Sequence, residues 1–268
     1  MMTSPLLLEH DDSGVARLTL NRPDLHNAFD DKLIAELIHT LSDLEADPNL
    51  RVLILTGAGK SFSAGADLQW MRRMADYSTA ENLEDAAMLA EVMRRLDSFP
   101  RPVVGLINGP AYGGGVGLAA CCDIVVASEL ASFCLSEVKL GLIPAVISPY
   151  VVAAIGARQA RRYFMTAETI PATEALRIGL VHRVVAPHAL EKAGDHFTAM
   201  LLKNGPEALR EAKDLVFAVD RPITDDVIGG TGRRIAERRA SAEGREGIQA
   251  FLDKRQPAWQ ACVKGKSV

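Results

Sequence analysis

Glu137 is the residue of this sequence best placed to move a proton. It lies in the stretch FCLSEVKLGLIP over residues 133–144, where most of its neighbours are apolar. Burial among such neighbours raises the pKa of a carboxyl group and suits it to proton transfer near neutral pH. The alternative is a glutamate that is either exposed or paired with Lys139, and this stretch by itself leaves both interpretations open.

Two glycine-rich turns could present unpaired backbone N–H groups to a ligand. SFSAGADL covers residues 61–68 and NGPAYGGGVGL covers 108–118, and each follows a short apolar run. Very small side chains let a ligand approach the main chain, and the start of a helix leaves N–H groups unpaired. The alternative for the first turn is a tight strand-to-helix connection that binds nothing.

A dinucleotide-binding turn is the main rival interpretation of the second stretch. Gly113 and Gly115 loosely fit the GxGxxG pattern, but Leu118 stands where the third glycine belongs. The acidic residue expected about 20 positions on, at a strand end, is Glu137 within a mixed segment. The details therefore argue against a dinucleotide site.

The segments that would position these residues alternate between strands and helices. Apolar residues at helical spacing predict a helix over 30–45, capped by Asp30, and another over 80–98. An alternating pair of runs around the turn Asp11–Gly14 predicts a hairpin. Continuous apolar runs predict strands buried on both faces; they cover 52–55, 102–107 and 123–127. This order is typical of an α/β protein with parallel strands.

From Pro206 onward the pattern is almost purely helical. Helices are predicted over 206–219, 224–241 and 243–254. We therefore expect a core over residues 1–200 that carries the site, followed by a helical region over 201–268.

Composition excludes several classes of function. The net charge of -4 and only 14 aromatic residues argue against DNA as a partner and make RNA binding an unfavoured alternative. No apolar run reaches the roughly 20 residues that span a bilayer, and the N-terminus lacks the pattern of a signal peptide. The cysteines fit no zinc spacing, so we expect no metal and buried, reduced thiols in a cytoplasmic protein. They are Cys121, Cys122, Cys134 and Cys262.

Five motifs together resemble the crotonase, or enoyl-CoA hydratase/isomerase, superfamily. SAGADL, GPAYGGG, ACCDI, FCLSEVKLGLIP and EALRIGLV occur in the order and approximate spacing of that family, and the resemblance covers nearly the whole chain. It implies an α/β fold, a crotonase-like ββα spiral core with a C-terminal helical trimerisation region. It also implies an acyl-CoA substrate, no separate cofactor, and a homotrimer or dimer of trimers.

The resemblance carries over to individual positions. It places the two oxyanion-hole N–H groups on Ala66 and Gly114, and proton transfer on Glu137. The remaining positions that it implies for substrate or coenzyme A are Arg22, Asp24, Leu25, His26, Ala64, Asp67, Leu68, Gly113 and Gly117, with Phe251 and Lys254 near the nucleotide bound by a neighbouring subunit.

One position departs from the family pattern. The two-glutamate hydratases carry their first glutamate just after the triple glycine, where this sequence has Gly117. Glu137 alone would then have to activate water and afterwards return its proton to the substrate. Alternatively, Glu137 moves a proton between Cα and Cγ, as in Δ3,Δ2-enoyl-CoA isomerases. An acyl-CoA-binding or RNA-binding module without catalysis is the alternative from a different class.

Among hydratases, the chain looks most like those acting on 3-methylglutaconyl-CoA or γ-carboxygeranoyl-CoA. The resemblance rests on GADLQWMRRM, VGLAACCD and FCLSEVKLGLIPAVISPYV. Both substrates carry a distal carboxylate, so Arg72 or Arg73 is a candidate to bind it, against the alternative of a solvated basic helix face.

Overall fold

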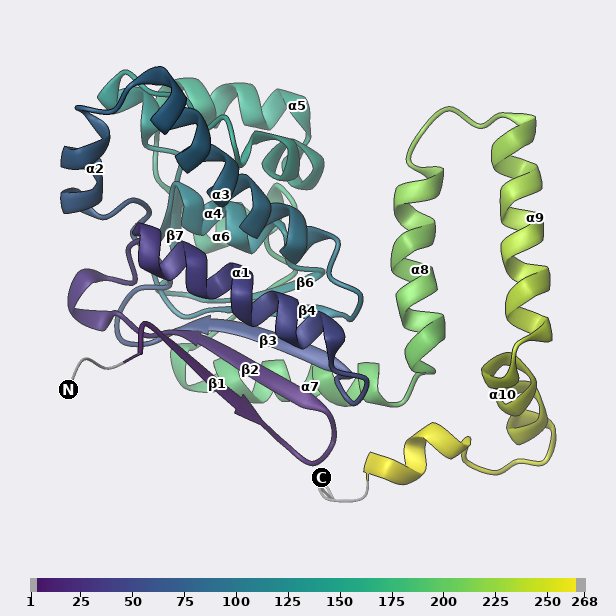
Figure 1. The fold of residues 1–268 in the computed structure, drawn as a ribbon. Coiled ribbons are helices and arrows are strands. Elements are labelled where there is room, and N and C mark those ends of the chain that lie inside the picture. Colours follow the sequence, from purple (N-terminus) through teal and green to yellow (C-terminus); the bar gives the residue numbers. More distant parts are fainter. Residues whose placement is uncertain (1–3, 264–268) are drawn as a thin grey trace.

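The computed structural model describes residues 4–263, with side chains to residue 261, and contains two β-sheets. The larger sheet has six strands in the order β1-β2-β3-β4-β6-β9 (Figure 1). β1 and β2 form the predicted antiparallel hairpin, and the other neighbours pair in parallel. The strands are β1 Leu6–His10, β2 Val15–Leu20, β3 Val52–Gly57, β4 Val103–Ile107, β6 Ile124–Ser128 and β9 Arg183–Val185.

Helices cover both faces of this sheet, which explains the continuous apolar runs of β3 and β4. α1 (Asp31–Ala46) and α3 (Thr79–Asp97) lie over one face and α7 (Leu190–Leu202) lies over the other (Figure 1). Alternate side chains of β3 therefore enter two different apolar clusters, Leu53 and Leu55 on the α1 side and Val52 and Ile54 on the α7 side.

Capping groups set where two of the helices begin. The Asp30 carboxylate accepts the Leu33 N–H at the start of α1, as predicted. Ser78 and Glu81 form a reciprocal capping box at the start of α3. The other helices of the core are α2 Leu68–Met74, α4 Gly114–Ala120, α5 Ser148–Thr166 and α6 Ala172–Arg177, with 3₁₀ turns at Pro23–Leu25, Glu137–Leu140 and Pro187–Ala189.

A second, three-stranded sheet connects two parts of the chain that carry candidate residues. It consists of β5 (Ala111–Tyr112), β7 (Ser132–Cys134) and β8 (Ile170–Pro171), in the order β5-β7-β8. Tyr112 is paired with Cys134 in the parallel register of β5 and β7. The residues after these two strands, Gly113 onward and Leu135 onward, therefore leave the sheet side by side.

The C-terminal helices stand away from the sheet (Figure 1). α8 (Pro206–Val219), α9 (Asp225–Ala240) and α10 (Ala242–Leu252) match the three predicted helices, and a 3₁₀ turn over Ala258–Val263 follows. α8 and α9 lie side by side, and no side chain of α8 is fully buried. Apolar side chains on this region are left exposed; they include Val216, Phe217, Ile228, Ile235, Ile248 and Phe251.

Two further expectations concern the cysteines and membranes. Cys121, Cys122 and Cys134 are buried free thiols, whereas the Cys262 side chain lies outside the part that the structure describes. Between residues 4 and 263, none of the helices combines the length and the apolar character needed to span a bilayer.

Candidate active site

The two glycine-rich turns lie against each other through backbone hydrogen bonds. The Ser63 N–H donates to Pro110 O at 3.1 Å, and the Tyr112 N–H donates to Ser63 O at 2.8 Å. Gly65 has φ +83°, and a Cβ there would lie 2.9 Å from Tyr112 O. Only glycine combines this positive φ with such close contact, so the small residues of both turns are required by their packing.

Ala66 and Gly114 each present a free N–H group at this junction. The residues on either side of Ala66 are hydrogen-bonded to Phe29: Gly65 O accepts the Phe29 N–H, and the Asp67 N–H donates to Phe29 O. The Ala66 N–H itself has no acceptor within residues 4–263. Gly114 is the first residue of α4, and its N–H has no acceptor in the described chain either. Unpaired N–H groups on adjacent turns are the geometry that an oxyanion hole requires.

Glu137 lies against Gly113, the residue that precedes Gly114. The Gly113 N–H donates to Cys134 O at 2.9 Å, which fixes the glycine turn next to the chain leading to Glu137. Glu137 Oε1 is 3.2 Å from the point that a Cβ on Gly113 would occupy, so the missing side chain leaves room at the carboxylate.

The environment of Glu137 suits it to exchange protons. Its Oε2 atom is buried without a hydrogen-bond partner in the described structure, and burial raises the pKa of this carboxyl group above its usual range. The alternative of an exposed or Lys139-paired glutamate is wrong, because Glu137 is partly buried and no ion pair joins it to Lys139 in the described part. Glu137 is therefore the candidate acid and base of the site.

Gly117 is buried, and the structure leaves no room there for the second carboxylate of the two-glutamate pattern. A Cβ at this position would overlap Ile147 Cγ2 and lie 3.1 Å from Met93 Cε. Ile147 is itself buried, at the start of α5. Position 117 therefore lacks a carboxylate in the sequence and has no space for one in the packing of the described residues.

Replacing Gly117 with glutamate should destabilise the protein rather than add a catalytic group. Overpacking of this kind costs about 1–3 kcal/mol or more, which urea unfolding would detect. The double variant with Ile147→Ala should recover much of that loss, because it removes the overlapping methyl groups. Equal stability of Gly117→Glu and the unmodified protein would contradict this account.

The residues proposed to contact coenzyme A fall into two groups in this protomer. Ala64 and Leu68 are exposed on the loop that contains Ala66, and Leu68 is 73% exposed. Asp24 and Leu25 are exposed on the neighbouring loop. The two loops are adjacent, because the Ala64 N–H donates to His26 O at 2.9 Å, so these exposed positions lie on neighbouring segments of the surface.

The other group is occupied by interactions within the protein. The Arg22 guanidinium contacts the Asp30 and Asp67 carboxylates, and Asp67 caps α2 through the Gln69 and Trp70 N–H groups. His26 Nδ1 lies 3.0 Å from Ser61 Oγ. These side chains therefore stabilise the loop through contacts within the protein.

Phe251 and Lys254 lie elsewhere in the protomer. Phe251 is 82% exposed at the end of α10, and Lys254 follows it with φ +56°. Figure 1 shows α10 next to α9 and apart from the core that contains α2 and α4. One protomer therefore does not bring these two residues to Glu137.

The two arginines after the first loop differ in their surroundings. Arg73 forms an ion pair with Asp31 at 2.7 Å, whereas Arg72 is exposed and has no ion pair within the described residues. Of the two arginines, Arg72 is therefore the one whose charge is not paired with a carboxylate in the described part of the chain.

Two residues that hold the site together carried no clear signal in the sequence. Asn27 is fully buried, and its side-chain amide donates to Ala58 O and Ser61 O while its Oδ1 accepts from the Arg22 N–H. Ile147 closes the space at Gly117. The sequence could have suggested that Asn27 is a buried asparagine within a turn. The contact of Ile147 could not be foreseen, because its partner Gly117 is 30 positions away in the chain.

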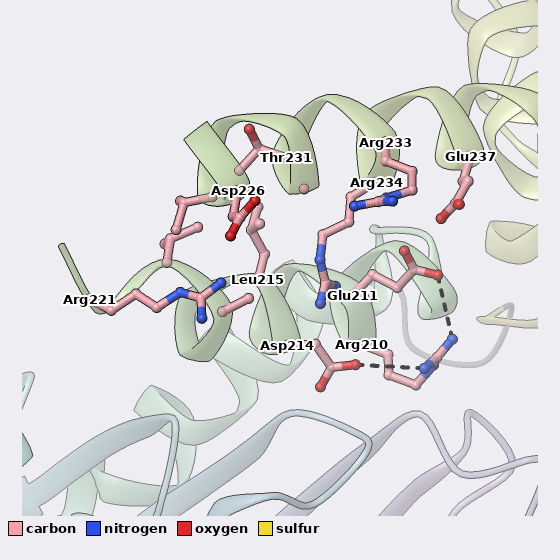
Figure 2. A pocket seen from close by; sticks show the side chains of 14 residues that line it. Arg210, Glu211, Asp214, Leu215, Arg221, Asp226, Thr231, Arg233, Arg234 and Glu237 are labelled. Carbon is pink, nitrogen blue, oxygen red and sulfur yellow. Dashed lines mark ion pairs between the residues drawn. The ribbon is translucent and has the colours of Figure 1, made fainter. Parts of the chain in front are cut away.

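A separate cleft between α8 and α9 lies far from these residues. It has a volume of about 710 Å³, and Figure 2 shows that charged side chains from both helices point into it. Its arginines are matched by as many carboxylates, so it lacks the positive charge that a CoA phosphate would require. The charged residues are Arg210, Arg221, Arg233, Arg234, Glu211, Asp214, Asp226 and Glu237.

Comparison with known proteins identifies a family that matches nearly the whole of this chain. The family described as Enoyl-CoA hydratase/isomerase matches residues 10–262. The chain belongs to this family.

Individual relatives agree with this assignment. A protein of Thermus thermophilus to which enoyl-CoA hydratase activity has been ascribed is 38% identical over 91% of this chain and 96% of its own. A solved structure of an enoyl-CoA hydratase from Shewanella pealeana is 46% identical, with a TM-score of 0.92 over 95% of this chain and 96% of that one. The 2,3-dehydroadipyl-CoA hydratase of Escherichia coli is 32% identical over 91% of this chain and 94% of its own.

These matches confirm two predictions made from the sequence. The chain has the α/β crotonase fold, and it is an enzyme of the enoyl-CoA hydratase type. The residues that perform the chemistry and the identity of the acyl group are proposals, taken up next.

Proposed function

We propose that this protein adds water across the α,β double bond of an enoyl-CoA thioester, with Glu137 as its one acid and base. The observation that carries the proposal is the buried, unpartnered Oε2 of Glu137, whose carboxylate lies against Gly113, the residue before the unpaired N–H of Gly114. The Ala66 N–H would complete the oxyanion hole from the neighbouring turn.

The mechanism follows from these groups. The ionised Glu137 carboxylate accepts a proton from water as the water oxygen bonds to Cβ. The π electrons of the double bond move toward the thioester carbonyl, whose oxygen becomes an enolate stabilised by the Ala66 and Gly114 N–H groups. Protonated Glu137 then returns its proton to Cα, which regenerates the carbonyl. The net result is one water added and a carboxylate restored to its starting state.

Isomerisation is the second candidate function, and the packing at Gly117 favours it. Ile147 fills the space in which a second carboxylate could help to hold water. Glu137 could then take a proton from Cα and deliver it to Cγ, with the same oxyanion hole holding the dienolate.

A panel of enoyl-CoA thioesters incubated in H2O and in D2O separates these reactions by product mass. A hydratase yields a product heavier by one water, and in D2O it also carries deuterium at Cα. An isomerase yields a migrated double bond and deuterium exchange without the mass of water. A protein that does neither, yet binds the thioesters, would be the non-catalytic alternative.

The pH dependence of the reaction should reflect the burial of Glu137. The base must be ionised in the free enzyme, and burial raises its pKa. We therefore expect kcat/KM to fall as the pH is lowered, with an apparent pKa above the ordinary value for glutamate, about 4.3. A flat profile down to pH 4 would contradict the role of Glu137.

The acyl group that we infer is a branched one with a distal carboxylate, such as 3-methylglutaconyl or γ-carboxygeranoyl. Support comes from the motifs shared with those hydratases, from a relative named for a dehydroadipyl thioester, and from the uncommitted Arg72. Arg72→Met should lower kcat/KM for methylglutaconyl-CoA more than for crotonyl-CoA. Arg73→Met serves as the control, since Arg73 already pairs with Asp31. An equal effect of Arg72→Met on both substrates would refute the role.

A trimer, or a dimer of trimers, is the assembly that we propose. The exposed apolar faces of α8, α9 and α10 have no partner in the described protomer, and burying such faces favours association. In that assembly Phe251 and Lys254 would reach the coenzyme bound by a neighbour. Sedimentation should give a mass of three or six chains, and a stable monomer would overturn the proposal.

A further inference from the structure

Arg22 lies at the centre of a largely buried ion cluster next to the oxyanion hole. Its Nη2 is 2.9 Å from Asp30 Oδ2 and 3.2 Å from Asp67 Oδ2, and its Nη1 donates to Ala28 O. The three side chains are only 16%, 18% and 10% exposed. One cation thus joins two carboxylates that begin two different helices, α1 and α2.

The first link from Arg22 to the oxyanion hole runs through Asp67, which follows Ala66 in the chain. Asp67 Oδ1 accepts the Gln69 and Trp70 N–H groups, so the same side chain that contacts Arg22 also fixes the start of α2. The Asp67 N–H donates to Phe29 O at 2.8 Å. A displacement of Asp67 would therefore be transmitted to Ala66.

The second link runs through the loop between Arg22 and Phe29. Arg22 binds this loop at Ala28 O and through its own N–H to Asn27 Oδ1. The Phe29 N–H donates to Gly65 O at 2.6 Å. Because the C=O and N–H of a trans peptide unit point in opposite directions, this bond orients the Gly65–Ala66 peptide and with it the Ala66 N–H.

The charges of the cluster argue against a direct role in binding phosphate. Asp30 and Asp67 both contact the single Arg22 guanidinium, and Asp30 Oδ1 and Asp67 Oδ1 are occupied by helix capping. Two carboxylates around one guanidinium leave a net negative cluster, which repels a phosphate.

We propose that Arg22 is a positioning residue that orients the Ala66 N–H of the oxyanion hole through Asp67 and the Ala28–Phe29 segment. This positioning role rests on the proposed function, because the orientation of the Ala66 N–H affects the reaction only if a carbonyl oxygen is stabilised there. Arg22 touches no reacting atom and acts through its two attachments.

A matched pair of substitutions tests the proposal. Asp67→Asn and Asp30→Asn are isosteric, and both can keep the capping Oδ1 while each breaks one arm of the same guanidinium. Asp67→Asn should lower kcat by about tenfold or more, since a lost oxyanion donor costs 10²–10³ and a misplaced one costs less, with KM little changed. Asp30→Asn should keep kcat near the unmodified value.

Infrared spectroscopy gives a readout that a merely structural role would not move. The C=O stretch of a bound ¹³C-labelled enoyl-CoA shifts to lower frequency in proportion to the polarisation by the oxyanion hole. That shift should shrink in Asp67→Asn and persist in Asp30→Asn. Equal shifts and equal kcat in the two variants would overturn the proposal. The shift of the C=O stretch requires only that the thioester binds. If the unmodified protein shows this shift but adds no water, the proposed function is refuted instead.

Arg22 itself is tested with shortened substrates. Arg22→Met should reduce kcat for a CoA thioester and for the corresponding pantetheine thioester by the same factor, and Arg22→Lys should restore part of it. A loss confined to KM for the CoA thioester would assign Arg22 to the CoA phosphates and overturn the positioning role. Thermal unfolding of each variant identifies any loss of activity that comes from misfolding. If Arg22→Met does not fold, the kinetics of Arg22→Lys and Asp67→Asn test the proposal.

Discussion

Replacing Glu137 with glutamine is expected to lower kcat by about 10²- to 10⁴-fold, the usual contribution of a positioned acid and base. Glutamine keeps the size of the side chain but cannot accept a proton from water. The N–H groups of Ala66 and Gly114 are untouched, so the enoyl-CoA should still bind. Steady-state kinetics on the best substrate of the thioester panel measures the loss. Full activity in Glu137→Gln would exclude the mechanism proposed above.

The same variant should be more stable than the unmodified protein at neutral pH. Burial raises the pKa of Glu137 in the folded state, so the stability linked to this group is present at low pH and is lost as the pH rises through the folded pKa. Glutamine removes that dependence. The melting temperature of Glu137→Gln should exceed that of the unmodified protein at pH 7, with the difference shrinking toward pH 4. Glu129→Gln, at an exposed glutamate just after β6, is the control for both measurements.

Proline in place of Gly114 is expected to reduce kcat by about 10²- to 10³-fold, because it removes one oxyanion-hole donor. Gly114 is the first residue of α4, a position at which proline is compatible with a helix. Gly114→Ala is the matched control, because it also adds a Cβ, which would lie 3.0 Å from Phe29 Cε2, yet keeps the N–H.

The comparison between proline and alanine isolates the donor. If crowding against Phe29 were the whole effect, alanine would lose a similar share of activity. If the N–H carries the effect, alanine should retain most of kcat while proline does not. Circular dichroism and thermal unfolding establish that both variants fold. Equal activity of Gly114→Pro and Gly114→Ala would remove Gly114 from the oxyanion hole.

Much of the fold was predictable because its signals are local. The hairpin, the Asp30 cap, the buried β3 and β4 strands and the three C-terminal helices each follow from residues close together in the sequence. Side-chain periodicity and capping depend on neighbours within a few positions. The small sheet of β5, β7 and β8 was not predicted, since its two- and three-residue strands carry no periodicity and pair only with distant partners.

The sequence by itself determined which chemical groups are available: the glycine-rich turns around Ala66 and Gly114, a carboxyl group at Glu137, and none at Gly117. Residue type and order are enough for this. Only the tertiary structure decided that β5 and β7 bring Glu137 to Gly113, that Ile147 closes the space at Gly117, and that Arg22 faces two carboxylates of the protein. Each of these depends on contacts between segments far apart in the chain, and local patterns do not specify such partners.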